Sequence, residues 1–183
     1  MSKFNVPSKK EVSEKNQAIF DNIELGLGFV PNLYAYYAKN DTALEDYLAF
    51  ANRKTTLNKR EKEVINLIVS QSNECAYCLS AHTTIAELNG FSRDEIIELR
   101  KGGFKADKKI DALAKFTHEV INHNGKVSEE GKEVFFDAGY DEANLIDVVL
   151  SIGEKTISNF IYNIAGFDID FPLPPSLDFK SDD

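Results

Sequence analysis

Two cysteines and a histidine lie close together in the stretch "NECAYCLSAH". Cys75 and Cys78 are the only cysteines of the chain, and His82 follows four residues after the second. On one helix, for which Asn73 is the expected N-cap, the three side chains would share one face. A cysteine in the first helical turn lies near the positive end of the helix dipole, which favours the reactive thiolate. The C-x-x-C spacing also permits a reversible disulfide across one turn.

Three interpretations of this group compete. A structural zinc site needs four ligands, and neither a second cysteine pair nor the spacing of His118 and His123 supplies the missing one. Free cysteines are often buried and inert, so simple packing is the second interpretation. The pair spacing, with a histidine on the same face, favours the third, a redox-active dithiol of Cys75 and Cys78 with no bound metal. A thioredoxin-type site is not expected, because that motif belongs to a βαβ setting.

Composition narrows the classes of function. The chain has 183 residues, of which 43 % are hydrophobic, and this is enough for the core of one domain. Acidic residues outnumber Lys and Arg by 30 to 21, and the net charge of −9 argues against nucleic acid or an anionic membrane as a partner. The polar N-terminus lacks the apolar stretch of a secretory signal. We therefore expect a cytoplasmic protein, in which a passive structural disulfide would not persist.

Helix signals run along most of the chain. Capping pairs such as Asn58 with Glu61 precede apolar residues at helical spacing, and no segment alternates as a strand does. The sequence therefore predicts an all-α fold of about eight or nine helices in one domain, residues 1–165. The long segment 143–165 is apolar on most faces, as expected of a helix in a core or an oligomer interface. The proline-containing residues 166–183 are predicted to form an extended tail.

A longer motif surrounds the cysteine pair. Glu63 is followed by eleven residues, then Cys75-Ala76-Tyr77-Cys78, then three residues and His82. This motif, with segments such as "GFVPN", "DEIIELRKGG" and "IDVVLSIGEKTISNFIYNIA", resembles the AhpD-like, carboxymuconolactone decarboxylase superfamily in its peroxidase-related, alkylhydroperoxidase AhpD core branch. The resemblance covers roughly residues 25–165, with the core motif region at 57–105.

The resemblance implies a helical domain that assembles into homo-oligomers and reduces hydroperoxides, alkyl hydroperoxides among them. Cys78 would attack the peroxide and become a sulfenic acid, and Cys75 would donate a proton and then close the disulfide. Glu63 and His82 would form the proton relay, which suits a reaction that needs a thiolate and a proton for the leaving oxygen. An external thiol reductant, such as a lipoyl-bearing redox protein, would restore the dithiol, and no bound cofactor is expected.

Tyr77 departs from the family pattern. The best-studied members carry histidine directly before the second cysteine, and a neutral phenol cannot pass a proton at neutral pH as an imidazole can. The relay would then run through water or the Tyr77 hydroxyl, or Tyr77 would serve packing alone. Glu63 also has an alternative, because the apolar residues of its helix centre on another face. Without its spacing to Cys75 it would be interpreted as a solvated surface carboxylate.

Two other functions remain open at this stage. A lactone decarboxylase-like lyase could use the same fold, but such members do not depend on the cysteine pair. A non-catalytic module could use the dithiol of Cys75 and Cys78 to sense oxidation. Peroxide consumption that requires Cys78 would separate the peroxidase interpretation from both.

Overall fold

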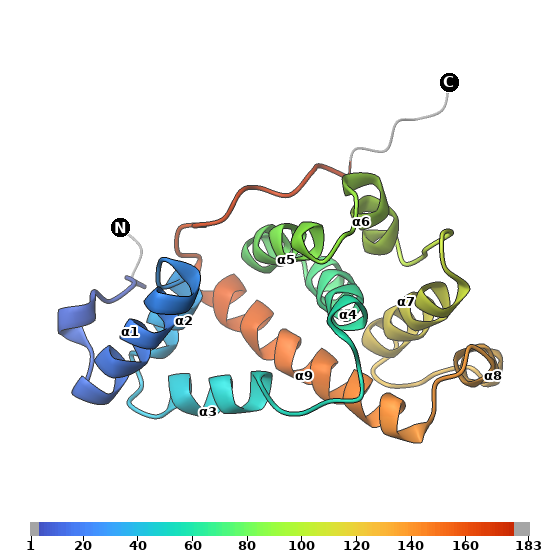
Figure 1. Cartoon of the computed structure of the whole chain (residues 1–183), viewed down its shortest axis with the longest axis horizontal. Helices are drawn as coiled ribbons and strands as arrows, with labels where there is room; N and C mark the ends of the chain where they lie inside the picture. The colour runs from blue at the N-terminus through green and yellow to red at the C-terminus, as the bar shows by residue number, and fades with distance from the viewer. Residues whose placement is uncertain (1–3, 178–183) are drawn as a thin grey trace.

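The computed structural model describes residues 4–177, and helices make up nearly all of this part apart from its connections (Figure 1). The described part holds nine α-helices, one short 3-10 helix and no strand, so the predicted all-α fold is confirmed. The elements are η1 (Lys9–Glu11), α1 (Glu14–Leu27), α2 (Asn32–Tyr37), α3 (Ala43–Ala51), α4 (Lys59–Ser72), α5 (Ala76–Leu88), α6 (Arg93–Arg100), α7 (Lys108–Asn122), α8 (Glu129–Asp137) and α9 (Glu142–Ala165). Residues 1–3 of the predicted domain and 178–183 of the predicted tail lie outside the described residues.

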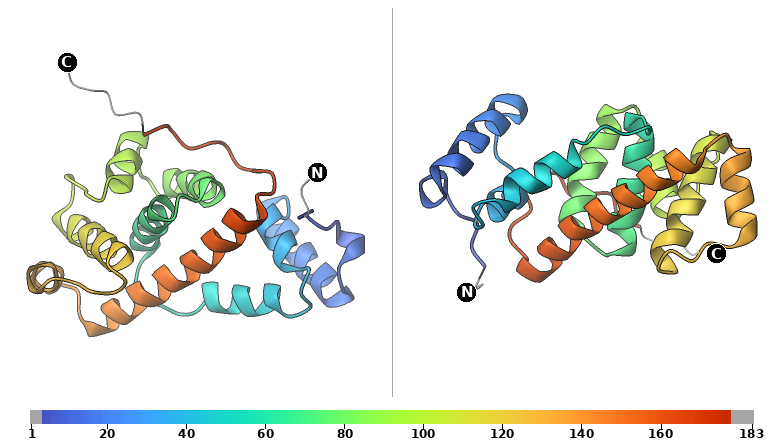
Figure 2. Two further views of the ribbon diagram at one scale, coloured as in Figure 1. Left: turned by 180° about the vertical axis from the view of Figure 1, so that it is seen from behind. Right: turned by 90° about the horizontal axis from the view of Figure 1, so that it is seen from below.

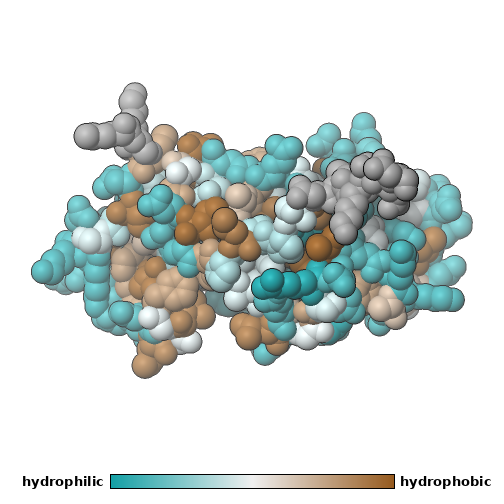
Figure 3. All heavy atoms as spheres, turned by 90° about the horizontal axis from the view of Figure 1, so that it is seen from above, coloured by the Kyte–Doolittle hydropathy of each residue, from teal (hydrophilic) through white to brown (hydrophobic). Residues whose placement is uncertain are grey.

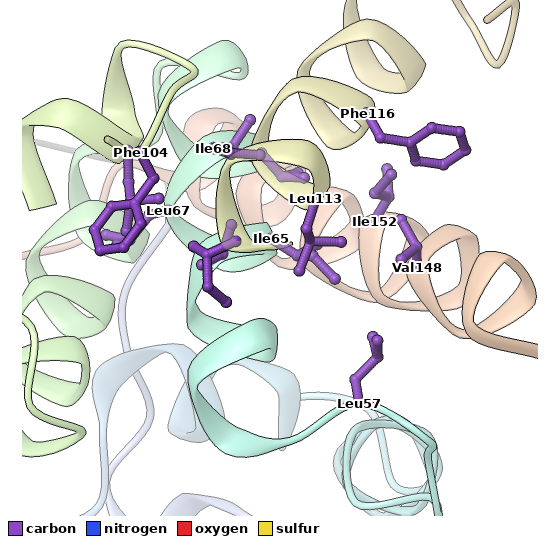
Figure 4. Packing of buried hydrophobic residues seen from close by; sticks show 14 of the residues in the cluster. Leu57, Ile65, Leu67, Ile68, Phe104, Leu113, Phe116, Val148 and Ile152 are labelled. Atoms are coloured by element: carbon purple, nitrogen blue, oxygen red, sulfur yellow. The ribbon is translucent and has the colours of Figure 1, made fainter. Parts of the chain in front are cut away.

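Helix α4 lies at the centre of the fold and contacts α5, α6, α7 and α9 (Figures 1 and 2). Its side chains Ile65 and Ile68 belong to the larger hydrophobic core, together with Leu113 of α7 and Val148 and Ile152 of α9 (Figure 4). Each fully buried aliphatic side chain of this kind stabilises the folded state by about 1.5–3 kcal/mol. The predicted capping box of Asn58 and Glu61 begins the helix. The element that carries Glu63 is therefore firmly held.

A second hydrophobic cluster contains both cysteines. It joins α2, α3 and α5 to the chain that follows α9, and it includes Tyr37 and Tyr47, whose rings stack with centroids 4.5 Å apart. Cys75 and Cys78 are both part of this cluster. The candidate redox pair is thus built into a packed interior and does not lie on an exposed loop.

Helix α9 buries many of its polar residues and exposes many of its large apolar ones, unlike a simple core helix. Seen from below, α9 and α3 lie in front of α4 and α5 (Figure 2). The buried polar residues of α9 are Asp147, Ser151, Glu154, Lys155, Ser158 and Asn159. Its exposed large apolar residues are Ile146, Val149, Leu150, Ile157, Phe160 and Ile164. The sequence analysis did not predict this division of faces. It considered how many residues of the segment are apolar, and not that the polar ones share one face.

The chain after α9 has no helix or strand over residues 166–177. It begins at Gly166, which ends α9 in the left-handed conformation, and runs above α5 toward α6 (Figure 1). Hydrogen bonds near each end help to hold it. Asp170 accepts a hydrogen bond of 2.6 Å from the Asn32 N–H at the start of α2, and the Arg100 guanidinium donates one of 2.6 Å to the Pro175 carbonyl. This segment therefore covers one side of α5.

Candidate active site

The junction between α4 and α5 fixes the position of the cysteine pair. Helix α4 ends in two hydrogen bonds typical of a Schellman motif: the Cys75 N–H donates to the Ser70 carbonyl at 2.9 Å and the Glu74 N–H to the Gln71 carbonyl at 3.1 Å. Glu74 takes the left-handed conformation that this motif needs, with φ of 51°. The chain turns within these few residues, so α5 starts directly beside the end of α4.

Cys75, and not Asn73, is the N-cap of α5. The prediction for Asn73 was wrong because this residue still belongs to the turn that ends α4. The sulfur of Cys75 accepts a hydrogen bond of 3.4 Å from the Cys78 N–H, in the way that a capping oxygen does. Both thiols are free and buried. The pair therefore meets across the first turn of α5, as the spacing predicted.

The two sulfurs differ in acidity and in access. The pKa of Cys75 is lowered, because the Cys78 thiol and the Cys78 N–H donate hydrogen bonds to its sulfur and outweigh the effect of burial. The pKa of Cys78 is raised well above its usual range, because its proton is held by Cys75 and the site is desolvated. Cys78 lines the pocket described below, whereas Cys75 is not among the described residues that line it. The lower pKa thus favours Cys75 as the nucleophile, whereas access from the pocket favours Cys78.

Glu63 and His82 are direct partners. His82 Nδ1 lies 2.7 Å from Glu63 Oε2, and the Asn66 amide donates to Glu63 Oε1 at 3.1 Å. Since an ionised carboxylate can only accept, this pairing places the histidine proton on Nδ1 and leaves Nε2 as an acceptor. Glu63 is 6 % exposed, so it is not the solvated carboxylate of the alternative interpretation. The structure brings Glu63, Cys78 and His82 to one pocket, while their roles stay predictions.

Tyr77 is almost fully buried, and its hydroxyl accepts a hydrogen bond of 3.2 Å from the Leu33 N–H at α2. Its ring contacts those of Tyr162, Phe167 and Phe171, with centroids 5.2, 5.3 and 5.7 Å away. Burial raises the pKa of Tyr77 strongly, so the phenol stays neutral. Tyr77 joins α5 to α2 and to the C-terminal segment, and it also lines the pocket.

A second wall of the pocket, from α9 and α3, was missed by the sequence analysis. It carries the ion pair of Lys155 and Glu154, with Nζ 3.6 Å from Oε1, and the Tyr47 hydroxyl donates to the same carboxylate. The Ser158 hydroxyl donates to Tyr47 at 2.7 Å. Burial opposes the charge on Lys155, but the neighbouring Glu154 carboxylate outweighs it, and the pKa of Lys155 is raised well above its usual value.

A sequence signal for this wall exists. Within the otherwise apolar segment, Ser151, Lys155, Ser158 and Asn159 recur at helical spacing and mark a polar face that looks inward. A charged pair inside such a segment is the feature to search for, because charges are seldom buried without a partner.

The pocket between these walls has a volume of about 540 Å³. Its lining comes from the end of α1, the α1–α2 connection and α2, from α3, α4, α5 and α9, and from residues 170–172 of the C-terminal segment. Most of the lining is apolar or aromatic, and Leu27 and Leu88 are strongly exposed. Seen from above, hydrophobic residues gather mainly over the half of the molecule that holds α1, α2 and the start of the C-terminal segment (Figure 3). The site is therefore open to a molecule with a substantial apolar part.

The described residues contain neither a cluster of metal ligands nor a membrane-spanning helix. Among residues 4–177, no group of three or more His, Cys, Asp and Glu side chains is arranged to hold a metal ion. No helix of this part is long and apolar enough to cross a lipid bilayer. The expected absence of zinc and the expected cytoplasmic location both stay predictions.

Comparison with known proteins places this arrangement in a family. Residues 38–103, from the end of α2 through α6, match the Carboxymuconolactone decarboxylase family. A peroxidase-related protein with an alkylhydroperoxidase AhpD core from Ralstonia eutropha JMP134 has the same fold, with a TM-score of 0.83 and 20 % identity over 92 % of each chain. Residues 38–103 thus carry the pattern of the Carboxymuconolactone decarboxylase family, and the described structure has an AhpD-like fold. The resemblance carried by the motif from Glu63 to His82 is thereby confirmed.

Further known proteins are similar to this chain at low identity. A peroxidase-related protein from Silicibacter sp. TM1040 is 22 % identical, covers 91 % of each chain and has a TM-score of 0.79. A variant of the debrominase Bmp8, in complex with 2,3,4-tribromopyrrole, is 16 % identical over 93 % of this chain and 92 % of its own, with a TM-score of 0.76. The protein YdfG of Bacillus subtilis is 28 % identical over 105 residues, which are 56 % of this chain and 71 % of YdfG.

Proposed function

We propose that this AhpD-like protein reduces organic hydroperoxides with the dithiol of Cys75 and Cys78. The observation that carries the proposal is the joint placement of a thiol, Cys78, and a carboxylate–histidine pair, Glu63 and His82, on one pocket, with a second thiol directly behind the first. Peroxide reduction needs these parts: a sulfur nucleophile, a proton for the leaving oxygen and a thiol to resolve the product.

The reaction proceeds in three balanced steps. The Cys78 thiol passes its proton to His82 Nε2, and the thiolate attacks one peroxide oxygen. An S–O bond forms, the O–O bond breaks, and the leaving alkoxide takes that proton back from His82, which Glu63 holds in place. The Cys75 thiol then attacks the sulfenic acid, which forms the disulfide and releases water. An external dithiol, such as a lipoyl-bearing protein, reduces the disulfide and is itself oxidised to a disulfide.

The pocket supports a substrate larger than hydrogen peroxide. A volume of about 540 Å³ with a largely apolar lining lies in the range of sites for small organic molecules. We therefore place alkyl and aryl hydroperoxides first among the substrates. Hydrogen peroxide can reach the same sulfur but fills little of this volume.

The test uses reduced protein mixed with excess cumene hydroperoxide. We expect two thiols per chain to disappear and one cumyl alcohol to form per dithiol, and a Cys78→Ser variant should form none. A wild-type protein that oxidises no faster than free dithiothreitol of equal thiol concentration would contradict the proposal. Oxidation without catalytic turnover under any dithiol reductant would instead favour a redox-sensing module.

A second candidate is reductive debromination of an aromatic ring. Two observations favour it, namely the aromatic lining around Tyr77 and Phe171 and the shared fold with the debrominase Bmp8. The same dithiol would supply two electrons and two protons: a C–H bond replaces the C–Br bond, bromide and one proton are released, and the disulfide forms. Bromide release from a bromopyrrole, measured beside cumyl alcohol formation, decides between the two substrates.

We also propose that the protein is a homo-oligomer whose copies meet on the outward face of α9. Four large apolar residues of this face are arranged symmetrically about Gly153: Val149 and Ile157 lie four residues away, and Ile146 and Phe160 seven. Gly153 itself faces open space. A second copy crossing antiparallel at Gly153 would match each apolar residue with an apolar residue, which is what a two-fold interface requires.

A further inference from the structure

Lys155 is a buried ammonium group that faces the pocket. The residue is 5 % exposed and lies in the middle of α9, among the residues that line the pocket with Cys78. Its partner is Glu154, at 3.6 Å, and no acceptor among residues 4–177 lies within hydrogen-bonding distance of its Nζ. A buried ammonium normally has its N–H groups satisfied, because their desolvation is costly. The three donors of Lys155 are therefore available to a group inside the pocket.

The surroundings hold Lys155 in this position. Tyr47 donates to the Glu154 carboxylate, Ser158 donates to Tyr47, and the Tyr37 hydroxyl lies 3.5 Å from the Ser158 hydroxyl. This chain of contacts connects α2, α3 and α9. A hydrophobic pair at the positions of Glu154 and Lys155 would fold at least as well, since buried ion pairs seldom stabilise a protein relative to apolar residues. The network thus points to a function for the charge.

We propose that Lys155 stabilises the negative charge of the reaction, first on the sulfur of Cys78 and then on the oxygen that leaves it. This inference rests on the proposed peroxide reduction. As the S–O bond forms and the O–O bond breaks, the charge moves from sulfur to the alkoxide, which remains inside the pocket that Lys155 lines. Lys155 keeps its own proton throughout, and the relay of Glu63 and His82 supplies the proton that the alkoxide takes. Fixed charges of this kind act strongly in a site from which water is excluded.

Lys155 is the basic group of the pocket that acts on the Cys78 sulfur. Glu63, Glu154, Asp170 and a thiolate on Cys75 are acidic, and the remaining basic groups of the pocket are Lys62 and His82. Four tyrosines, Tyr34, Tyr37, Tyr47 and Tyr162, have raised pKa values from burial and stay neutral. Among the charges that act on Cys78, Lys155 favours its thiolate, whereas a Cys75 thiolate opposes it.

The test measures alkylation of Cys78 in a Cys75→Ser background, where Cys78 is the sole thiol of the chain. We expect Lys155→Met to move the pH midpoint of iodoacetamide alkylation up by about one to two units, as loss of a nearby opposite charge does. Lys155→Arg should retain most of the original profile. Glu154→Gln should move the midpoint down, because it removes a negative charge and leaves Lys155 unpaired.

Opposite shifts from the two members of one ion pair separate an electrostatic role from a structural one. If Lys155→Met and Glu154→Gln move the midpoint in the same direction, or leave it in place, the proposal is wrong. The double variant Glu154→Gln/Lys155→Met, which buries no unpaired charge, guards against misfolding and should still show the upward shift relative to Glu154→Gln.

A second measurement does not depend on the fraction of Cys78 that is present as thiolate. Iodoacetate and iodoacetamide react at the same sulfur, but only iodoacetate carries a negative charge. The ratio of their rates at Cys78 should fall about ten-fold in Lys155→Met and stay near the wild-type ratio in Lys155→Arg. An unchanged ratio in Lys155→Met would overturn the inference. Neither readout involves peroxide, so a protein without peroxidase activity can still pass this test, and failure here leaves the proposed function to its own experiment.

Discussion

His82 Nδ1 lies 2.7 Å from Glu63 Oε2, although the two residues are 19 positions apart and belong to different helices. The pairing orients the imidazole toward the pocket and fixes which ring nitrogen carries the proton. A carboxylate–histidine pair of this kind can tune and supply protons, and it gives the first prediction.

Glu63→Gln and His82→Asn should each slow peroxide consumption by about 10²-fold, since positioned acid–base groups contribute on the order of 10² to 10⁴. Gln keeps the shape of Glu63 and can still hydrogen bond to His82 and Asn66, so the melting temperature should change little. Stopped-flow measurement of cumene hydroperoxide consumption provides the rate. A large fall in melting temperature with an unchanged rate would show that the pair holds the fold instead.

The two cysteines should form a reversible intrachain disulfide, with Cys78 as the attacking sulfur. Mild oxidation should remove two hydrogens from one peptide that spans both residues, as mass spectrometry can show. Cys75→Ser should trap a sulfenic acid on Cys78, because Cys78 lines the pocket. Trapping on Cys75 in Cys78→Ser at an equal or higher rate would mean that acidity outweighs access and that the two roles are reversed.

The pH dependence of thiol reactivity follows from the lowered pKa of Cys75. A thiol with a lowered pKa becomes a thiolate at a lower pH, so alkylation of the wild-type protein should begin below the range of a free cysteine, whose reference value is 9.0. In Cys78→Ala the side-chain donor is lost, although the backbone donor remains. The alkylation midpoint of Cys75 should therefore rise, and an equal or lower midpoint would show that Cys78 does not stabilise this thiolate.

Tyr77→Phe should destabilise the fold by about 1–2 kcal/mol, because it leaves the buried Leu33 N–H without its acceptor. Urea unfolding measures this difference. Tyr162→Phe is the matched control in the same aromatic cluster, since no hydrogen bond of its hydroxyl is described within residues 4–177. If Tyr77→Phe consumes peroxide much more slowly than Tyr162→Phe does, the Tyr77 hydroxyl takes part in proton transfer.

Ile157→Glu should dissociate the proposed oligomer, because it places a charge at the apolar crossing of two α9 helices. Light scattering with size-exclusion chromatography should find a lower mass with unchanged helix content. Leu25→Glu is the control, since Leu25 lies on α1, outside the proposed interface, and is more exposed than Ile157. An equal mass for Ile157→Glu and the wild-type protein, or a monomeric wild-type protein, would remove α9 as the interface.

Sequence reasoning reached the fold and half of the site. Helical spacing and capping pairs predicted the helices, and the spacing from Glu63 to His82 identified side chains that the structure brings together. The N-cap at Cys75 was missed, because the Schellman motif depends on a left-handed Glu74 that no composition rule foresees. Lys155 and Tyr47 were missed because their meeting depends on the packing of α3 against α9, which local sequence does not encode.

The pocket draws its walls from separate stretches of the chain. The cysteines, Glu63 and His82 all lie within residues 38–103, whereas the α1–α2 connection and residues 170–172 lie outside that match. Substitutions in these end segments can therefore reshape the pocket while leaving the cysteines, Glu63 and His82 in place. Phe29 and Phe171, whose rings meet edge to face, join the two end segments at the pocket wall, so exchanging either ring would change which substrates fit.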